Sequence, residues 1–256
     1  MSDIRASQSP SRPLVFPAPP VACVPVANDQ EFFPVRRIYC VGRNYAAHVR
    51  EMGGNEREPP FFFQKPTDAI VPSGSVIEYP LATSSFQHEV ELVIAIGTAG
   101  ACIRTEHAYS HVFGFAVGID LTRRDLQREA RDAGRPWECG KSFDKSAPIS
   151  AIVRTGPAAL PSNAGISLRV NGVVRQQAVL GDMIWNCDEI VSRLSLLYAL
   201  GPGDLIFTGT PAGVADLNPG DRVEGFIEGV GELTFRVAPH KRSSTNVQGH
   251  STTAKY

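Results

Sequence analysis

The 256-residue sequence lacks the features that mark several classes of protein. Acidic and basic residues nearly balance, at 26 and 25, and neither a basic stripe nor an acidic tail is present. This balance argues against nucleic acid or a membrane surface as a partner. No apolar run is long enough to span a bilayer. The first residues lack a basic region followed by an apolar core, so we expect no secretory signal.

The cysteines show no pattern. The five cysteines are odd in number, scattered along the chain and form no CxxC pair. Such usage is typical of reduced thiols, and we therefore expect a cytoplasmic protein. Internal repeats and the phosphate-binding pattern GxxxxGK[ST] are absent as well. The cysteines are Cys23, Cys40, Cys102, Cys139 and Cys187.

Glycine and proline are plentiful, at 23 and 20 residues, which suits a strand-rich fold with many turns. The length suits one domain of moderate size. Residues 1–35 are polar and then proline-rich, so we expect an N-terminal arm that is partly disordered. Residues 239–256 are polar and are expected to form a disordered tail. The folded domain is expected over residues 36–238.

Apolar runs bounded by turn residues predict most of the strands, and longer mixed segments predict helices. The pair Asn171-Gly172 predicts a tight hairpin turn. We therefore expect an α+β fold that is rich in strands. The expected strands cover residues 21–26, 36–41, 61–65, 76–79, 90–96, 112–119, 166–170, 173–176, 205–208, 222–227 and 232–237, and the expected helices cover residues 45–52, 121–133 and 188–199.

Two carboxylates stand at the start of one buried strand. Glu89 and Glu91 lead into an apolar run that ends at Gly97, and residues two apart in a strand point to the same face. Two like charges held together in a mostly buried place repel each other, so they need a cation. The alternative is a strand end at the surface, where both glutamates are solvated. The spacing alone does not decide between these two interpretations.

A third carboxylate, Asp120, ends the apolar strand that is expected over residues 112–119. Two strands that each deliver carboxylates at one end could make an all-oxygen metal site. Three carboxylates without histidine or cysteine favour Mg²⁺ over zinc, with Mn²⁺ or Ca²⁺ as alternatives. His88 points to the face opposite Glu89 and is therefore not counted as a ligand.

A candidate general base is His48 with Glu51. On the helix expected over residues 45–52 they stand at i and i+3, so their side chains are neighbours. A carboxylate beside an imidazole fixes its tautomer and raises its basicity, which is how a general base is built. The spacing alone favours the alternative, an ordinary surface pair.

Two further segments could carry chemistry. Lys141 lies among small residues and could offer a positive donor to a developing oxyanion, although a lone lysine is more often solvated. Residues 208–214 follow a strand, and their glycines would let backbone N–H groups and hydroxyls approach an anion. A plain hairpin loop is the alternative for this segment.

Six segments together carry a resemblance that spacing alone does not supply. They occur in the same order as in the catalytic domain of the fumarylacetoacetate hydrolase family, which the chain resembles over residues 36–238. The resemblance implies the mixed β-sandwich roll of that family's C-terminal domain, a homodimer, and Mg²⁺ or Mn²⁺ in the middle. The segments are YCVGRNYAAHVREMG, FFFQKPTDAIVPSG, HEVELVIAIG, GIDLTRRDLQ, GRPWECGKSFDKSAPI and LIFTGTPAGV.

The resemblance also implies roles for the candidate residues. It makes Glu89, Glu91 and Asp120 the metal ligands, in agreement with the interpretation from the residues themselves. It makes His48 and Glu51 the dyad that activates a water molecule.

The remaining roles concern the substrate. By resemblance, Lys141 is the cation beside the reacting carbonyl, and Arg124 and Gln127 hold the α-keto acid end of the substrate. Thr210 matches the threonine that binds the same carboxylate. The far end of a fumaryl group carries a second carboxylate, for which we expect an arginine partner. Arg57 is our first candidate for that partner, ahead of Arg43 and Arg123.

The implied reaction is metal-dependent hydrolysis of the carbon–carbon bond of a small-molecule 2,4-diketo acid. The N-terminal approach to the dyad looks most like fumarylpyruvate hydrolases of gentisate breakdown, an aromatic degradation route that yields fumarate and pyruvate at this step. The family alternatives are acetylpyruvate hydrolysis, oxaloacetate decarboxylation, and hydration or isomerisation of dienoates. From another class, the alternative is a catalytically silent protein with a structural metal site.

Overall fold

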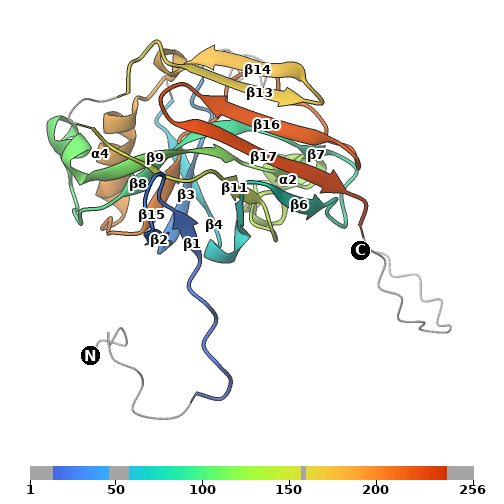
Figure 1. Cartoon of the computed structure of the whole chain (residues 1–256), viewed down its shortest axis with the longest axis horizontal. Coiled ribbons are helices and arrows are strands. Elements are labelled where there is room, and N and C mark those ends of the chain that lie inside the picture. The colour runs from blue at the N-terminus through green and yellow to red at the C-terminus, as the bar shows by residue number, and fades with distance from the viewer. Residues whose placement is uncertain (1–13, 46–57, 157–159, 241–256) are drawn as a thin grey trace.

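The computed structural model describes residues 14–45, 58–156 and 160–240, and its body is built mainly from strands (Figure 1). The strands are β1 (Cys23–Pro25), β2 (Phe32–Pro34), β3 (Arg37–Gly42), β4 (Phe61–Lys65), β5 (Ile70–Pro72), β6 (Ser75–Glu78), β7 (Phe86–Gln87), β8 (Val90–Ile96), β9 (Val112–Ile119), β10 (Thr122–Arg123), β11 (Ala147–Ile149), β12 (Val153–Arg154), β13 (Gly165–Val170), β14 (Val173–Val179), β15 (Asp204–Phe207), β16 (Arg222–Ile227) and β17 (Gly231–Ala238). The helices are α2 (Arg124–Asp132), α3 (Glu138–Lys141) and α4 (Cys187–Leu197), with short 3₁₀ helices η1 (Thr67–Ala69), η2 (Thr105–His111) and η3 (Leu180–Asp182).

Two sheets carry the fold. The larger has eight strands, seven in the order β4-β3-β15-β8-β9-β11-β5, with β12 also pairing to β9. The smaller has five strands in the order β14-β13-β16-β17-β6 and lies across the larger one (Figure 1). Both sheets mix parallel and antiparallel pairs. In the larger sheet, β15 runs parallel to β3 and antiparallel to β8, and in the smaller sheet, β17 runs parallel to β6 and antiparallel to β16. The predicted class, a strand-rich α+β fold with packed β-sheets, is confirmed.

Strand β8 is central because all seven of its residues are buried. Leu92 and Ile94 belong to the apolar core that also contains Leu168 and Phe235 of the five-stranded sheet. Val93 and Ala95 belong to a second core on the other face of β8. A strand buried on both faces has a continuous apolar run rather than an alternating one, which is the pattern seen in its sequence.

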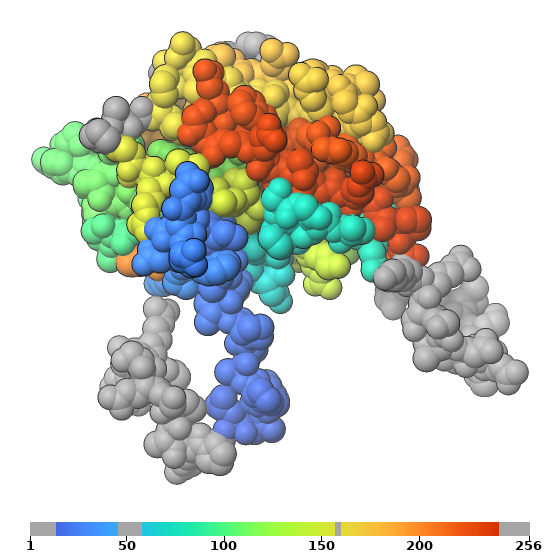
Figure 2. Space-filling model, in the orientation of Figure 1, coloured from blue at the N-terminus to red at the C-terminus, as the bar shows by residue number. Residues whose placement is uncertain are grey.

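The hairpin of β1 and β2 covers part of this second core, where Val24 and Phe33 are buried. Residues 14–22 before it contain no helix or strand and project from the body (Figure 2). Part of the segment expected to be an N-terminal arm therefore packs on the domain. The division of the chain at residues 35 and 238 stays a prediction, and residues 241–256 of the expected tail lie outside the described residues.

The prediction for the helix at residues 121–133 was wrong about where it starts. Thr122 pairs with Gln87 in the short strand β10, and α2 begins only at Arg124. Gly134 follows the helix with a φ of +64°, the left-handed conformation expected of a glycine after a helix end. Most of the helix expected over residues 45–52 falls on residues 46–57, outside the described residues.

Other elements agree with the sequence pattern. Strands β4 and β16 have the predicted bounds, and Asn171 and Gly172 have φ values of +52° and +79°, as a tight hairpin turn requires. The strands that prediction missed, such as β7 and β11, have only two or three residues, too few to show a period. Within the described residues, no helix combines the length and apolar character needed to cross a membrane.

Candidate active site

The three predicted metal ligands lie together at the ends of neighbouring strands. Glu89 stands directly before β8 and Glu91 lies within it, two positions further on, and Asp120 follows β9, which pairs with β8. The backbone N–H of Asp120 donates to the carbonyl oxygen of Glu89 at 2.8 Å, so this pairing continues past the strand ends. One carboxylate oxygen from each residue lies within 4.8 Å of the other two, and all three residues are buried. The surface alternative for the glutamates is therefore wrong.

The face of β8 that carries Glu91 changes character along its length. Val93 and Ala95 pack into the second core. At the other end, Glu89 and Glu91 line a cavity together with Asp120, and we call it the acidic cavity. Burial raises the pKa of Glu91 well above its usual range, and the neighbouring charges of Asp120 and Glu89 raise it further. A buried set of carboxylate oxygens fits a hard divalent cation, which would relieve this repulsion.

Lys141 is not a solvated lysine. Its Nζ donates to Glu89 Oε2 at 2.8 Å, to Asp120 Oδ2 at 2.7 Å and to Thr122 Oγ1 at 2.7 Å. Burial alone would lower the pKa of Lys141, but the carboxylates of Asp120 and Glu89 outweigh it, and the pKa lies above its usual value. The ammonium group is therefore charged and held at the carboxylates.

Helix α2 carries Arg124 and Gln127, which are both buried and line the same cavity as the three carboxylates. The guanidinium of Arg124 forms an ion pair with Glu89 and donates to Gln87 Oε1 at 2.7 Å and to Gln127 Oε1 at 3.2 Å. Helix α3 packs closely on α2, because a Cβ at Gly140 would lie 2.6 Å from the backbone nitrogen of Gln127. This close packing fixes Lys141 relative to the two substrate-binding candidates.

The segment at residues 208–214 also reaches the carboxylates. The N–H of Gly209 donates to Glu91 Oε2 at 2.7 Å, and Gly209 has a φ of +93°, which suits glycine. The hydroxyl of Thr210 donates to the carbonyl oxygen of Val90 at 2.8 Å and accepts from Gln176 Nε2 at 2.8 Å. The segment is thus part of the site rather than a plain hairpin loop.

Lys65 is a site residue that sequence reasoning missed. It is buried at the end of β4, and its Nζ lies 2.8 Å from Asp120 Oδ1. The signal that could have found it is its place in the apolar segment Phe61–Lys65, on the same face as Phe63 and directly before Pro66.

Aromatic side chains form one wall of the cavity. Phe63 and Trp137 line it together with Arg43, and the Trp137 ring meets the edge of Phe61 at a centroid distance of 5.0 Å. Arg123 does not line this cavity, because its guanidinium lies 4.4 Å from the centroid of the Phe143 ring, beside a different hollow. This position gives no support to Arg123 as the partner of a distal carboxylate, and that role stays a prediction.

Three predicted site residues lie outside the described residues. They are His48, Glu51 and Arg57. Their roles stay predictions.

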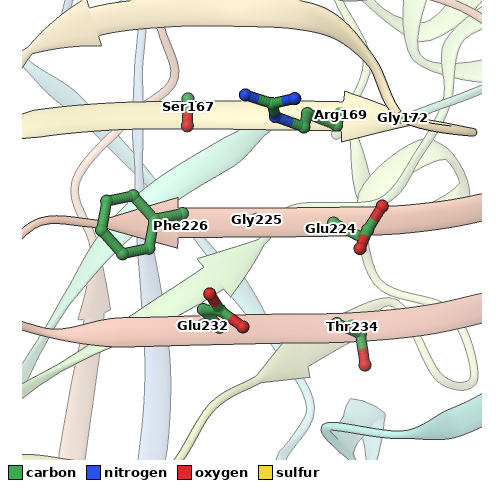
Figure 3. Close-up of a pocket in the computed structure, with 8 residues that line it drawn as sticks. All are labelled: Ser167, Arg169, Gly172, Glu224, Gly225, Phe226, Glu232 and Thr234. Carbon is green, nitrogen blue, oxygen red and sulfur yellow. The ribbon is translucent and has the colours of Figure 1, made fainter.

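A larger hollow lies elsewhere, on the outer face of the five-stranded sheet (Figure 3). Arg169, Glu224 and Glu232 line it, and Figure 3 shows them spread over three neighbouring strands. These residues form no cluster with metal-ligand spacing in the described part of the chain, which has such a cluster only at Glu89, Glu91 and Asp120. The acidic cavity is therefore the better candidate for chemistry.

Comparisons with known proteins agree with this choice. The model of the fumarylacetoacetate (FAA) hydrolase C-terminal family matches residues 37–238. The crystal structure of fumarylpyruvate hydrolase from Pseudomonas aeruginosa, in complex with Mn²⁺ and pyruvate, is similar with a TM-score of 0.87 and 48% identity, covering 89% of this chain and 100% of that chain.

Two curated relatives differ in their activities. A fumarylpyruvate hydrolase of Ralstonia sp is 42% identical over 182 residues, which are 71% of this chain and 94% of that protein. A mitochondrial oxaloacetate tautomerase of Mus musculus is 40% identical over 202 residues, which are 79% of this chain and 91% of that protein. Similarity at this level therefore extends to two different reactions.

Proposed function

The chain belongs to the fumarylacetoacetate hydrolase family and is an enzyme that hydrolyses carbon–carbon bonds, and from that premise we propose that its substrate is an acylpyruvate. The substrate we propose is fumarylpyruvate, with fumarate and pyruvate as products. The observation that carries the proposal is the buried cluster of Glu89, Glu91 and Asp120, with the Lys141 ammonium 2.7 to 2.8 Å from two of them. An acylpyruvate offers this cluster a keto acid end that both a metal and a lysine can bind.

The residues that would hold a divalent cation, Mg²⁺ or Mn²⁺, are Glu89, Glu91 and Asp120. Their fit to such a cation rests on three buried oxygen donors within 4.8 Å and on Asp120 Oδ1, which accepts no hydrogen bond within the described residues. When bound, the cation would polarise the keto acid and stabilise negative charge on it. The solved relative that holds Mn²⁺ and pyruvate supports this assignment.

The chain's own residues would bind and orient the substrate around that site. Arg124 and Gln127 would hold the carboxylate of the α-keto acid, with the guanidinium as the charged partner. Thr210 would join them, although its hydroxyl proton, which now points to the carbonyl oxygen of Val90, would have to turn towards the substrate. Lys141 would donate to the keto oxygen on which charge develops. All three of its N–H groups now donate to Glu89, Asp120 and Thr122, so one of them, such as the donor to Thr122, would have to turn towards the substrate.

The dyad of His48 and Glu51 would act as the base. It would take a proton from water, whose hydroxide adds to the 4-keto carbon of the substrate. The bond between carbons 3 and 4 then breaks, the acyl group leaves as a carboxylic acid, and pyruvate leaves as its enolate. His48 or a water molecule returns the proton to carbon 3, which completes the addition of one water.

Replacing Lys141 by methionine should lower kcat for fumarylpyruvate by about 10²–10³-fold, the usual cost of removing one donor to a developing oxyanion. Steady-state kinetics with circular dichroism of the same samples would measure this. The exposed Lys145 serves as the matched control, since Lys145→Met changes the same charge nearby. A folded Lys141→Met enzyme with wild-type kcat would remove Lys141 from the mechanism.

Replacing Arg57 by alanine should reduce kcat/KM for fumarylpyruvate about 10- to 100-fold, the range for losing a hydrogen-bonded charged partner. Acetylpyruvate has no distal carboxylate, so its kcat/KM should change little. Both substrates are compared in one assay. Equal losses on both would take Arg57 out of the acyl pocket, and a selective loss in Arg43→Ala instead would assign the pocket to Arg43, which lines the cavity.

Oxaloacetate tautomerisation is the second candidate function, because the similarity to the Mus musculus tautomerase is nearly as high. A panel of fumarylpyruvate, acetylpyruvate and oxaloacetate separates the candidates. We expect pyruvate to be released fastest from fumarylpyruvate. Enol–keto conversion of oxaloacetate without release of pyruvate from any substrate would favour the tautomerase. No turnover of any of the three would favour a silent protein with a structural metal site.

We further propose that the enzyme is a cytoplasmic homodimer that acts in gentisate-type degradation of aromatic compounds. The support for this is the resemblance to fumarylpyruvate hydrolases. Light scattering of the purified protein would test the dimer, which should have twice the 27.7 kDa mass of the chain.

A further inference from the structure

Lys65 makes contacts that no role described so far explains. Besides its ion pair with Asp120 Oδ1 at 2.8 Å, its Nζ donates to the carbonyl oxygens of Leu121, at 3.3 Å, and of Lys141. The side chain has no exposed surface. A buried ammonium costs several kcal/mol unless its partners compensate, so these contacts are specific and not incidental.

The backbone of Lys65 is paired within the larger sheet. Lys65 pairs with Ile38 in the register of β3 and β4, and Pro66 ends the strand directly after it. On the side-chain end, the Nζ lies 5.6 Å from the centroid of the Phe143 ring. The ammonium group therefore has a fixed position from which it can orient others.

Within the described residues, the ion pairs of the acidic cavity go to Glu89 and Asp120 and not to Glu91. Glu89 pairs with Arg124 and Lys141, and Asp120 pairs with Lys65 and Lys141. Arg124 and Lys141 also have proposed contacts to the substrate, while Lys65 does not line the cavity. Of the two lysines that contact Asp120, Lys65 is therefore the one without a proposed contact to the substrate.

We propose that Lys65 is a positioning residue, which orients the Asp120 carboxylate for the divalent cation and fixes the end of α3 through the Lys141 carbonyl. The 2.8 Å contact to Asp120 Oδ1 lacks hydrogen-bond geometry, so it leaves this oxygen without a donor in the described residues. Oδ1 can therefore accept a cation while Lys65 remains beside it. The inference rests on the proposed cation site.

The test is Mn²⁺ binding to the metal-free full-length protein, followed by the electron paramagnetic resonance signal of free Mn²⁺. Lys65→Met should bind Mn²⁺ about 10- to 100-fold more weakly than wild type, the usual cost of losing a group that orients a metal ligand. Removing one positive charge would by itself tighten the binding of a cation. The two effects have opposite signs, so weaker binding identifies positioning.

Lys145→Met is the matched control and should bind Mn²⁺ as wild type does. Wild-type or tighter binding by folded Lys65→Met would overturn the proposal. Failure of wild type itself to bind Mn²⁺ would overturn the cation site and with it this inference. Should Lys65→Met not fold, Lys65→Gln, which keeps an N–H donor for the Lys141 carbonyl, gives the same decision by the same titration.

Discussion

Replacing Glu91 by alanine should abolish hydrolysis of fumarylpyruvate while the protein stays folded. Glu91 is buried beside Glu89 and Asp120, which raises its pKa, and the ion pairs at the cavity in the described part of the chain go to those two and not to Glu91. Its loss removes a repelling charge from the fold and one ligand from the cation. A Lewis acid is worth several kcal/mol, so the fall in kcat should be at least about a thousandfold.

Metal analysis of the purified variant should show no bound Mg²⁺ or Mn²⁺, and circular dichroism should be unchanged. Glu224→Ala is the matched control, because Glu224 also lies on a strand but on the outer face of the five-stranded sheet (Figure 3). Full activity in folded, metal-free Glu91→Ala protein would show that the cluster is not the catalytic metal site.

Replacing His48 by alanine should lower kcat for fumarylpyruvate by about 10²–10⁴-fold, the usual contribution of a general base. Glu51→Gln should lose less, because the amide still neighbours the imidazole and only weakens its orientation and basicity. Both variants should keep wild-type affinity for Mn²⁺, since neither is a proposed ligand.

Kinetics of the two variants side by side test the dyad. His48→Ala with wild-type kcat would show that another group activates the water. A larger loss in Glu51→Gln than in His48→Ala would reverse the two roles and make Glu51 the base.

The cluster of three carboxylates could be predicted because its signals are local. Glu89 and Glu91 stand two apart at the start of one apolar strand, and Asp120 directly follows another, so a period of two and two strand ends were enough. The sequence also showed the glycines of the segment at residues 208–214. The N–H of Gly209 donates to Glu91 because β15 lies beside β8. No local sequence pattern encodes that neighbourhood of the two strands.

The contacts of the lysines at the site could not be predicted from the sequence. Lys65 and the carbonyl of Lys141 are 76 positions apart, and their contact depends on the position of β4 in the sheet and on where α3 packs. Without the resemblance, a solvated Lys141 was the favoured interpretation, because its three acceptors lie just before β8, just after β9 and in β10. The start of α2 was misplaced for the same reason, since β10 exists only through its pairing with β7.

The most direct test of metal-dependent acylpyruvate hydrolysis is the turnover of fumarylpyruvate by wild-type protein before and after removal of metal. Protein stripped with EDTA should release no pyruvate, and added Mg²⁺ or Mn²⁺ should restore the release of equal amounts of fumarate and pyruvate. Undiminished release of both products by the stripped protein would contradict the account, and so would a reconstituted enzyme that leaves fumarylpyruvate intact.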